Sequence, residues 1–133
     1  MVSDDVISKD VRDFVTAHIR SVVQLELLLL LQADPDREWT SAELANELRI
    51  APDWAERESA ELARRGLLMI FDGASPRFGY AAPSAEVNAA VEELARTYAE
   101  RRVSLIEFLY SAPSGRIQSF ADAFRLKKDP SDG

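Results

Sequence analysis

Residues 40–82 read TSAELANELRIAPDWAERESAELARRGLLMIFDGASPRFGYAA, and this stretch decides the fold. It opens with Thr40, followed three residues later by Glu43. This spacing is typical of a capping box, in which the hydroxyl and the carboxylate accept from free backbone N–H groups at the start of a helix. Apolar side chains then recur on one face, so the sequence predicts a short helix over residues 41–49.

A second helix is predicted after a three-residue connection. Pro52 is favoured in the first turn of a helix and Gly66 just past its end, so this helix should run from Pro52 to about Arg65. Its inward face would consist of small and apolar side chains, namely Ala55, Ser59, Leu62 and Ala63. Two short helices with a tight connection and small residues at their crossing predict a helix-turn-helix.

The segment after the second helix distinguishes among helix-turn-helix types. Residues 67–71 (LLMIF) and 78–82 (FGYAA) are apolar runs that are compatible with strands. Asp72-Gly73 and Pro76 lie between them and favour a turn. A hairpin in this place would be the wing of a winged helix. The alternative is that LLMIF only ends the helix and that the rest is a loop.

Two more helices are predicted before this core. Apolar residues recur at helical spacing over residues 9–20, which indicates an amphipathic helix. Ser21, followed three residues later by Gln24, matches a second capping box. A separate and more apolar helix should therefore cover residues 22–32. That run is interrupted by polar side chains and would span only about 15 Å, half of a bilayer core, so we expect a buried helix rather than a membrane span.

The last part of the chain predicts a long helix. Over residues 84–111, apolar side chains recur at alternating spacings of four and three, as in a coiled-coil seam. We expect this seam to form a homodimer interface; the alternative is that the lead-in helix covers it within one chain. Residues 117–124 repeat an amphipathic pattern and predict a short helix docked on the same chain or on a second copy. The seam consists of Val87, Val91, Leu94, Tyr98, Arg101, Leu105 and Phe108.

The predicted fold is mainly α with a small β-hairpin: a winged helix-turn-helix with an N-terminal helix and a long C-terminal helix of the dimerisation type. We divide the 133 residues into a helical lead-in (1–20), the winged core (21–82) and the long helix with its tail (83–133). The length is close to that of a common single domain, and 47% apolar residues suffice to build a core.

Composition excludes several classes of function. The chain has no cysteine, which removes disulfides and thiol chemistry and suits a reducing compartment. The first residues are acidic where a secretory signal needs positive charge, so we expect a cytoplasmic protein without membrane contact. The net charge of −7 argues against sequence-blind nucleic-acid binding, which depends on phosphate neutralisation by Lys and Arg.

Enzyme chemistry finds no support in the sequence. It contains no Gly-rich phosphate loop, no GxSxG motif and no pair of His or Cys ligands. The single histidine, His18, lies on an amphipathic helix and is interpreted as a packed side chain. We therefore predict no catalytic residue, no metal site and no cofactor.

Residues 21–70, SVVQLELLLLLQADPDREWTSAELANELRIAPDWAERESAELARRGLLMI, resemble the winged helix-turn-helix core of bacterial transcription regulators. The layout is similar to that of the broad MarR-type superfamily, and to uncharacterised bacterial winged-helix proteins that share the lead-in and the FADAFRLKKD tail. The resemblance covers about residues 20–82. It implies DNA binding through the helix over residues 52–65 and the wing. The DNA-contacting residues that we predict are Arg57, Glu58, Glu61, Arg64, Arg65 and Arg77.

The predicted recognition helix is unusually acidic for this role. It carries four carboxylates beside three arginines, whereas base edges and phosphates are usually contacted by Arg, Lys, Asn, Gln, Ser or Thr. An alternative function is therefore a non-catalytic winged-helix module that binds a protein of the transcription or signalling machinery. For Trp54 we expect a ring packed against the first helix of the pair; the alternative is an exposed anchor for a protein partner.

Overall fold

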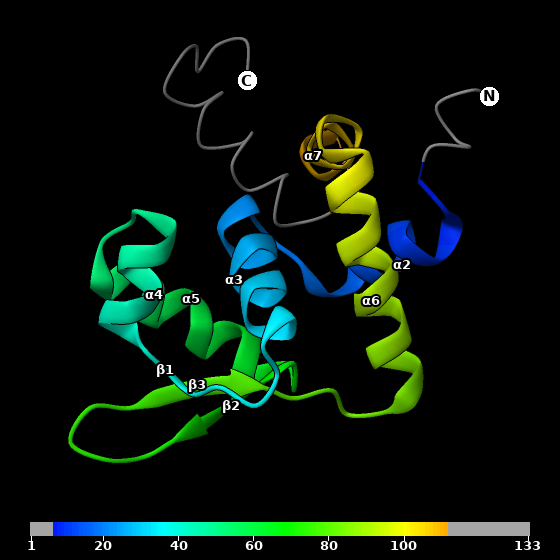
Figure 1. The fold of residues 1–133 in the computed structure, drawn as a ribbon. Helices are drawn as coiled ribbons and strands as arrows, with labels where there is room; N and C mark the ends of the chain where they lie inside the picture. The colour runs from blue at the N-terminus through cyan, green and yellow to red at the C-terminus, as the bar shows by residue number, and fades with distance from the viewer. Residues whose placement is uncertain (1–6, 112–133) are drawn as a thin grey trace, which may run out of the picture.

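The computed structural model describes residues 7–111 of the chain, which form helices around a small sheet (Figure 1). This bears out the predicted fold class, mainly α with a small β-hairpin. The helix predicted within residues 117–124 lies outside the described residues. In chain order the elements are α2 (Lys9–His18), α3 (Val22–Ala33), β1 (Trp39–Thr40), α4 (Ser41–Leu48), α5 (Pro52–Arg64), β2 (Leu68–Phe71), β3 (Arg77–Tyr80), α6 (Ala85–Glu100) and α7 (Arg102–Ser111).

The predicted capping boxes set the starts of α4 and α3. Thr40 Oγ1 accepts from the Glu43 N–H at 3.1 Å, and Glu43 Oε1 accepts from the Thr40 N–H at 3.0 Å, so this box is complete. Ser21 Oγ likewise accepts from the Gln24 N–H. The Gln24 side chain, however, accepts from the Arg20 N–H at 2.9 Å instead of the Ser21 N–H. It therefore ties α3 to the connection that precedes it.

The wing is present as predicted and belongs to a three-stranded antiparallel sheet in the order β1-β3-β2. In the hairpin, Ile70 lies opposite Phe78 and Phe71 opposite Arg77. The third strand was not predicted, because the two residues of β1 are too few for an alternating pattern. Trp39 in β1 pairs with Phe78 and is buried.

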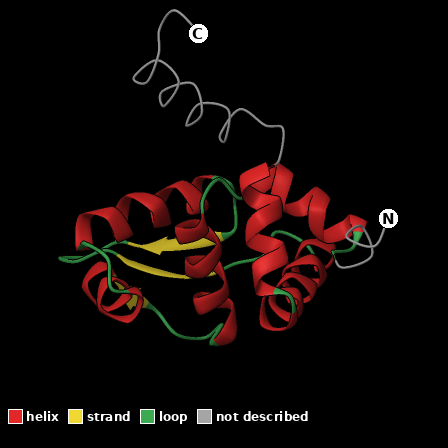
Figure 2. Cartoon of the chain, turned by 90° about the horizontal axis from the view of Figure 1, so that it is seen from above, coloured by secondary structure: helices red, strands yellow, loops and turns green. Residues whose placement is uncertain are grey.

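The helix α3 connects the two halves of the molecule. The sheet and the helices around it lie on one side, and a group of helices without strands lies on the other (Figure 2). The element α3 packs against α4, α5 and β3 in the first half and against α6 in the second. Leu25, Leu27, Leu28 and Leu31 are accordingly buried almost completely. Burial around most of its circumference explains why α3 is apolar nearly all round.

The single long helix predicted over residues 84–111 is wrong, because the structure breaks it at Arg101. This residue has φ −135° and ψ 49°, which are not helical values, and it ends α6 while α7 begins at the next residue. One turn earlier, Thr97 Oγ1 donates to the Glu93 carbonyl at 2.9 Å, an arrangement that favours bending of helices. Figure 1 shows the result, with α6 running up the right-hand side of the picture and α7 seen nearly end-on.

The break also corrects the predicted seam. Val91, Leu94 and Leu105 have no exposed surface and lie in the chain's own core, so they are not available to a second copy. Arg101 is exposed at the break. The remaining positions, Val87, Tyr98 and Phe108, are partly buried against the same core. The lead-in helix α2 covers α6 and also contacts α7 within the chain, as the alternative interpretation expected.

Among the described residues, no individual helix combines the length and the apolar character needed to cross a membrane. Only α2 and α3 taken together have enough length and apolar character, and these two helices are bent by 110° where they meet.

Arg49 supplies a test of backbone strain in the turn between α4 and α5. It closes α4 with φ 62° and ψ 48°, in the left-handed region that favours glycine. Arg49→Gly should therefore raise the free energy of unfolding by about 1 kcal/mol, as measured by urea denaturation. The matched control is Asn46→Gly, an exposed position inside α4, which should lower it by about 0.3 kcal/mol. A loss of stability in Arg49→Gly would contradict the strain argument.

Candidate nucleic-acid interface

The second helix of the helix-turn-helix, α5, and the wing position the predicted contact residues. Pro52 begins α5, and the chain leaves the helix through Arg65 and Gly66, whose φ of +84° suits glycine. Ala55, Ser59 and Leu62 face inward as predicted and are fully buried. The opposite face of α5 is therefore the one available to a ligand.

Arg65 differs from the other predicted contact residues because its side chain points into the protein. Only 13% of it is exposed, and it pairs with Glu61. Its guanidinium also donates to the His18 carbonyl at 3.4 Å and to Gln24 Oε1 at 3.3 Å. These contacts fix the end of α5 to α2 and α3. Arg65 is thus a structural residue in this chain, and we remove it from the proposed contact set.

Two predicted carboxylates are also engaged within the chain. Glu58 accepts from Gln24 Nε2 at 2.8 Å and is largely covered. Glu61 is held by both Arg64 and Arg65. Gln24 links this network through its contacts with Glu58 and Arg65, whereas the sequence predicted only its role in the capping box of α3. Its signal in the sequence is a carboxamide that interrupts an otherwise apolar helix.

The remaining arginines lie on the surface. Arg57 and Arg64 on α5 have 67% and 72% of their side chains exposed. In the wing, Arg77 is also exposed, and its Nε donates to Glu38 Oε1 at 2.8 Å. All three have a carboxylate nearby, although these exposed pairs contribute little to stability and can be exchanged for another anion.

Apolar side chains are exposed on the same α5 and on the wing. Trp54, in the first turn of α5, is 39% exposed, so the expected packing of its ring is only partial. On β2, Met69 and Ile70 are exposed as well. Asp53 and Glu56 add negative charge to the start of α5. The exposed side chains of α5 and the wing are therefore of basic, acidic and apolar kinds.

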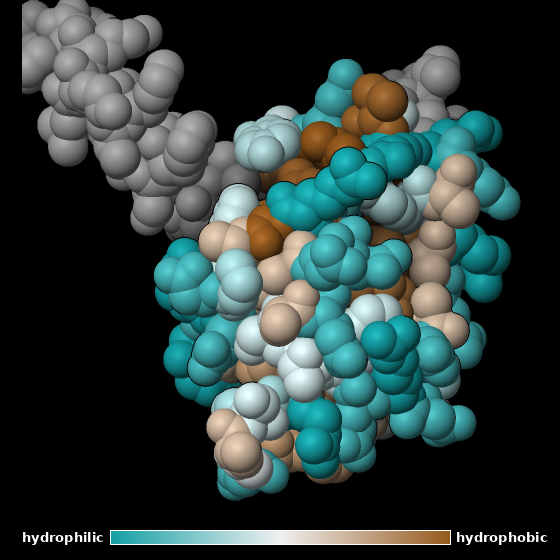
Figure 3. Space-filling model, turned by 60° about the vertical axis from the view of Figure 1, so that its left-hand side comes forward, coloured by the Kyte–Doolittle hydropathy of each residue, from teal (hydrophilic) through white to brown (hydrophobic). Residues whose placement is uncertain are grey.

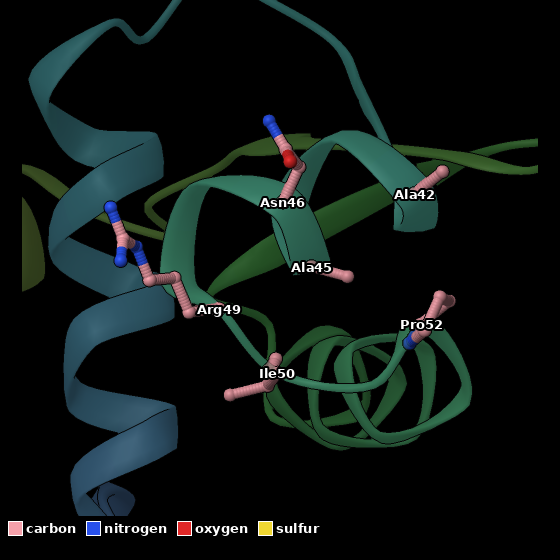
Figure 4. Close-up of a pocket in the computed structure, with 6 residues that line it drawn as sticks. All are labelled: Ala42, Ala45, Asn46, Arg49, Ile50 and Pro52. Carbon is pink, nitrogen blue, oxygen red and sulfur yellow. The ribbon is translucent and has the colours of Figure 1, made fainter.

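A shallow hollow of about 560 Å³ lies between α4 and the start of α5 (Figure 4). Small side chains form its walls, and Arg49 stands at its edge on the side of α3. Within residues 7–111, no group of three or more His, Asp or Glu side chains is placed to hold a metal ion. The lining residues of the hollow are Ala42, Ala45, Asn46, Arg49, Ile50 and Pro52.

His18 is expected to make the stability of the chain depend on pH. Burial, and secondarily the charge of Arg65, lowers the pKa of His18 below its ordinary value. The unfolded chain therefore takes up a proton first as the pH falls through about 6.5, and the free energy of unfolding should decrease below that pH. Denaturation at pH 7.5 and 5.5 measures this effect. Because His18 is the only histidine, His18→Gln should remove most of the difference; an unchanged difference would contradict the assignment.

Comparison with known proteins supports the fold. No protein-family model and no curated protein matches the chain. The structure is similar to HlyU from Vibrio cholerae, with a TM-score of 0.53 and 24% identity over 71% of this chain and 100% of HlyU. It is also similar to a MepR mutant from a multidrug-resistant S. aureus isolate, with a TM-score of 0.51 and 15% identity over 93% of this chain and 86% of MepR. Both are winged-helix proteins, and the predicted winged helix-turn-helix fold is confirmed.

Proposed function

We propose that this protein is a winged-helix transcriptional regulator that binds DNA through α5 and the wing. The observation that carries the proposal is the exposure of Arg57 and Arg64 on α5 and of Arg77 in the wing. In a winged helix, the second helix of the pair enters the major groove while the wing approaches the neighbouring backbone. The three arginines would neutralise phosphates on either side of that groove.

The acidic composition of α5 weakens this function less than the sequence suggests. Glu58 accepts from Gln24, and Glu61 is paired with Arg65, which is not one of the proposed contacts. The carboxylates left to face a phosphate backbone are then chiefly Asp53 and Glu56. Repulsion between solvated charges of this kind is on the order of 1 kcal/mol or less. A modest number of arginine contacts is enough to exceed it.

We further propose that the protein acts as a homodimer in which the exposed face of α7 forms the contact. Val103 and Tyr110 on this face are large apolar side chains, 69% and 56% exposed. Val103→Glu should raise the dimer dissociation constant by about tenfold or more, because it places a charge in an apolar contact. Sedimentation over a range of concentrations measures this. A concentration-independent monomer for the unaltered protein would contradict the dimer.

A second function is favoured by exposed apolar side chains on α5 and the wing. Trp54 on α5 and Met69 on β2 are both exposed, and Trp is enriched at the energetic centres of protein interfaces. A winged-helix module that binds another protein of the transcription or signalling machinery would use these side chains as anchors. In that case Trp54→Ala would abolish capture of the protein, and the arginines would not matter for DNA.

Binding to genomic DNA fragments at two salt concentrations tests the first proposal directly. Phosphate contacts release counterions, so the affinity should fall steeply between 50 and 200 mM salt, by roughly tenfold to a thousandfold for a few contacts per subunit. Absence of binding at the lower salt concentration would contradict the DNA-binding function and favour the protein-interaction module.

A further inference from the structure

A groove of about 400 Å³ opens where α3 and α4 meet the junction of α6 and α7. Its floor is apolar and only half-buried, in contrast to the fully buried leucines on the other sides of α3. On this side of the molecule, brown apolar atoms lie among teal hydrophilic ones toward the α7 end (Figure 3). The main lining residues are Glu26, Leu29, Leu30, Leu48, Tyr98 and Arg102.

One wall of the groove is held in place by a cluster around Glu26. The Tyr98 hydroxyl donates to Glu26 Oε2 at 2.6 Å, and Arg102 Nη2 lies 3.6 Å from the same oxygen. The Arg102 guanidinium also covers the Tyr98 ring, 5.0 Å from its centre. Burial and the Glu26 contact raise the pKa of Tyr98 to about 12, so the phenol keeps its proton. The groove is thus a formed feature with a fixed wall. Glu47 and Arg49 lie on its α4 side, so the lining as a whole balances two carboxylates with two guanidinium groups.

The chain itself contains a segment whose chemistry fits this groove. Residues 116–128 read RIQSFADAFRLKK, in which apolar side chains recur at positions 117, 120, 121 and 124. Such a face requires a partner surface in order to be buried. The segment carries four basic residues and one acidic residue, whereas residues 7–111 carry twelve basic and eighteen acidic. Charge and apolar pattern therefore both favour docking on the described part of the chain.

The connection to the groove is short enough. The helix α7 begins at Arg102, on the rim of the groove, and ten helical residues are about 15 Å long. Residues 112–115 follow and can extend over about 13 Å. They include Pro113 and Gly115, which favour a turn. A segment that reverses direction there can return along α7 to the groove.

We propose that residues 116–128 dock in the groove of their own chain, with their apolar face on Leu29, Leu30 and Leu48. The docked segment would join α4, the first helix of the helix-turn-helix, to α3 and to the α6–α7 junction. This inference does not depend on the proposed DNA-binding function. A second copy of the chain is the competing occupant.

Disulfide trapping in the full chain tests the proposal, because the protein has no cysteine of its own. The double variant Leu30→Cys with Phe120→Cys should form an intramolecular disulfide in most molecules at micromolar concentration, with the mass of one chain on a non-reducing gel. The control is Ala89→Cys with Phe120→Cys. Ala89 lies in a hollow lined by Asp10, Asp13, Glu86 and Glu93, which would attract a basic segment by charge alone. Trapping there should be at least about tenfold slower.

Two additional changes separate specific docking from chance encounters. Ile117→Asp with Phe124→Asp, added to the trapping pair, should slow disulfide formation by about tenfold because they remove the apolar contact. Circular dichroism checks that these variants retain their helices. Disulfides between two chains would overturn the proposal and assign the groove to a second copy. Equal trapping at Leu30 and Ala89, or none at Leu30, would overturn it as well.

Discussion

Leu94→Glu is expected to abolish the cooperative folding of the chain. Leu94 has no exposed surface and lies between Val91 and the rest of the core on α6. A carboxylate there would be buried without a partner, at a cost of several kcal/mol. That is comparable to the total stability of about 5–15 kcal/mol that domains of this kind possess. Loss of the thermal unfolding transition, followed by circular dichroism, is the measurement.

The matched control for this change is Ala99→Glu, which introduces the same side chain at an exposed position of the same helix. It should alter the free energy of unfolding by no more than about 0.5 kcal/mol. If Leu94→Glu instead produced a folded monomer from a dimeric protein, Leu94 would lie in an interface between copies. The burial of α6 within one chain would then be contradicted.

Arg57→Ala combined with Arg64→Ala is expected to produce the largest effect on DNA binding. Each phosphate contact contributes about 0.9 to the slope of log affinity against log salt. A dimer that loses two contacts per subunit should therefore lose three to four units of slope, and roughly a hundredfold to a thousandfold in affinity at low salt. Fluorescence anisotropy with one DNA fragment at several salt concentrations measures both quantities.

The control for the double variant is Arg96→Ala, an exposed arginine on α6 outside the proposed interface. It should leave the slope within about one unit of the original value. Glu56→Gln, which removes one exposed carboxylate from α5, should strengthen binding. If the slope stayed unchanged in the double variant while Trp54→Ala lost a protein partner, the protein-interaction function would replace DNA binding.

Local signals in the sequence were sufficient to predict most of the winged core. The Thr40–Glu43 box, Pro52 and Gly66 act within a few residues, and each is found in the expected role. Tertiary contacts determined what the sequence analysis missed. The apolar side chains across residues 84–111 do recur at heptad spacing, but they pack against α2 and α3 of the same chain instead of a second copy. In addition, the helix breaks at Arg101.

The candidate site was harder to predict because the charge of a residue does not reveal whether its side chain points into the protein or toward solvent. Arg64 and Arg65 are neighbours in the sequence, yet one side chain is exposed and the other is enclosed by Glu61, Gln24 and the His18 carbonyl. Only the position of α2 and α3 against the end of α5 distinguishes them. Composition alone therefore overestimated both the basic and the acidic groups that face a ligand.

The contact between the lead-in helix and α6 affects how the protein folds during synthesis. Ser8 Oγ donates to Glu93 Oε2 at 2.8 Å, and these residues are 85 positions apart. Val11 and Val15 on α2 are thus buried in a core that also requires α6. At about 5–20 residues per second, the ribosome needs several seconds or more after it has made α2 to synthesise α6. During this time the apolar face of the lead-in helix stays exposed to solvent. We therefore expect chains truncated before residue 84 to aggregate or to bind chaperones more than the full chain does.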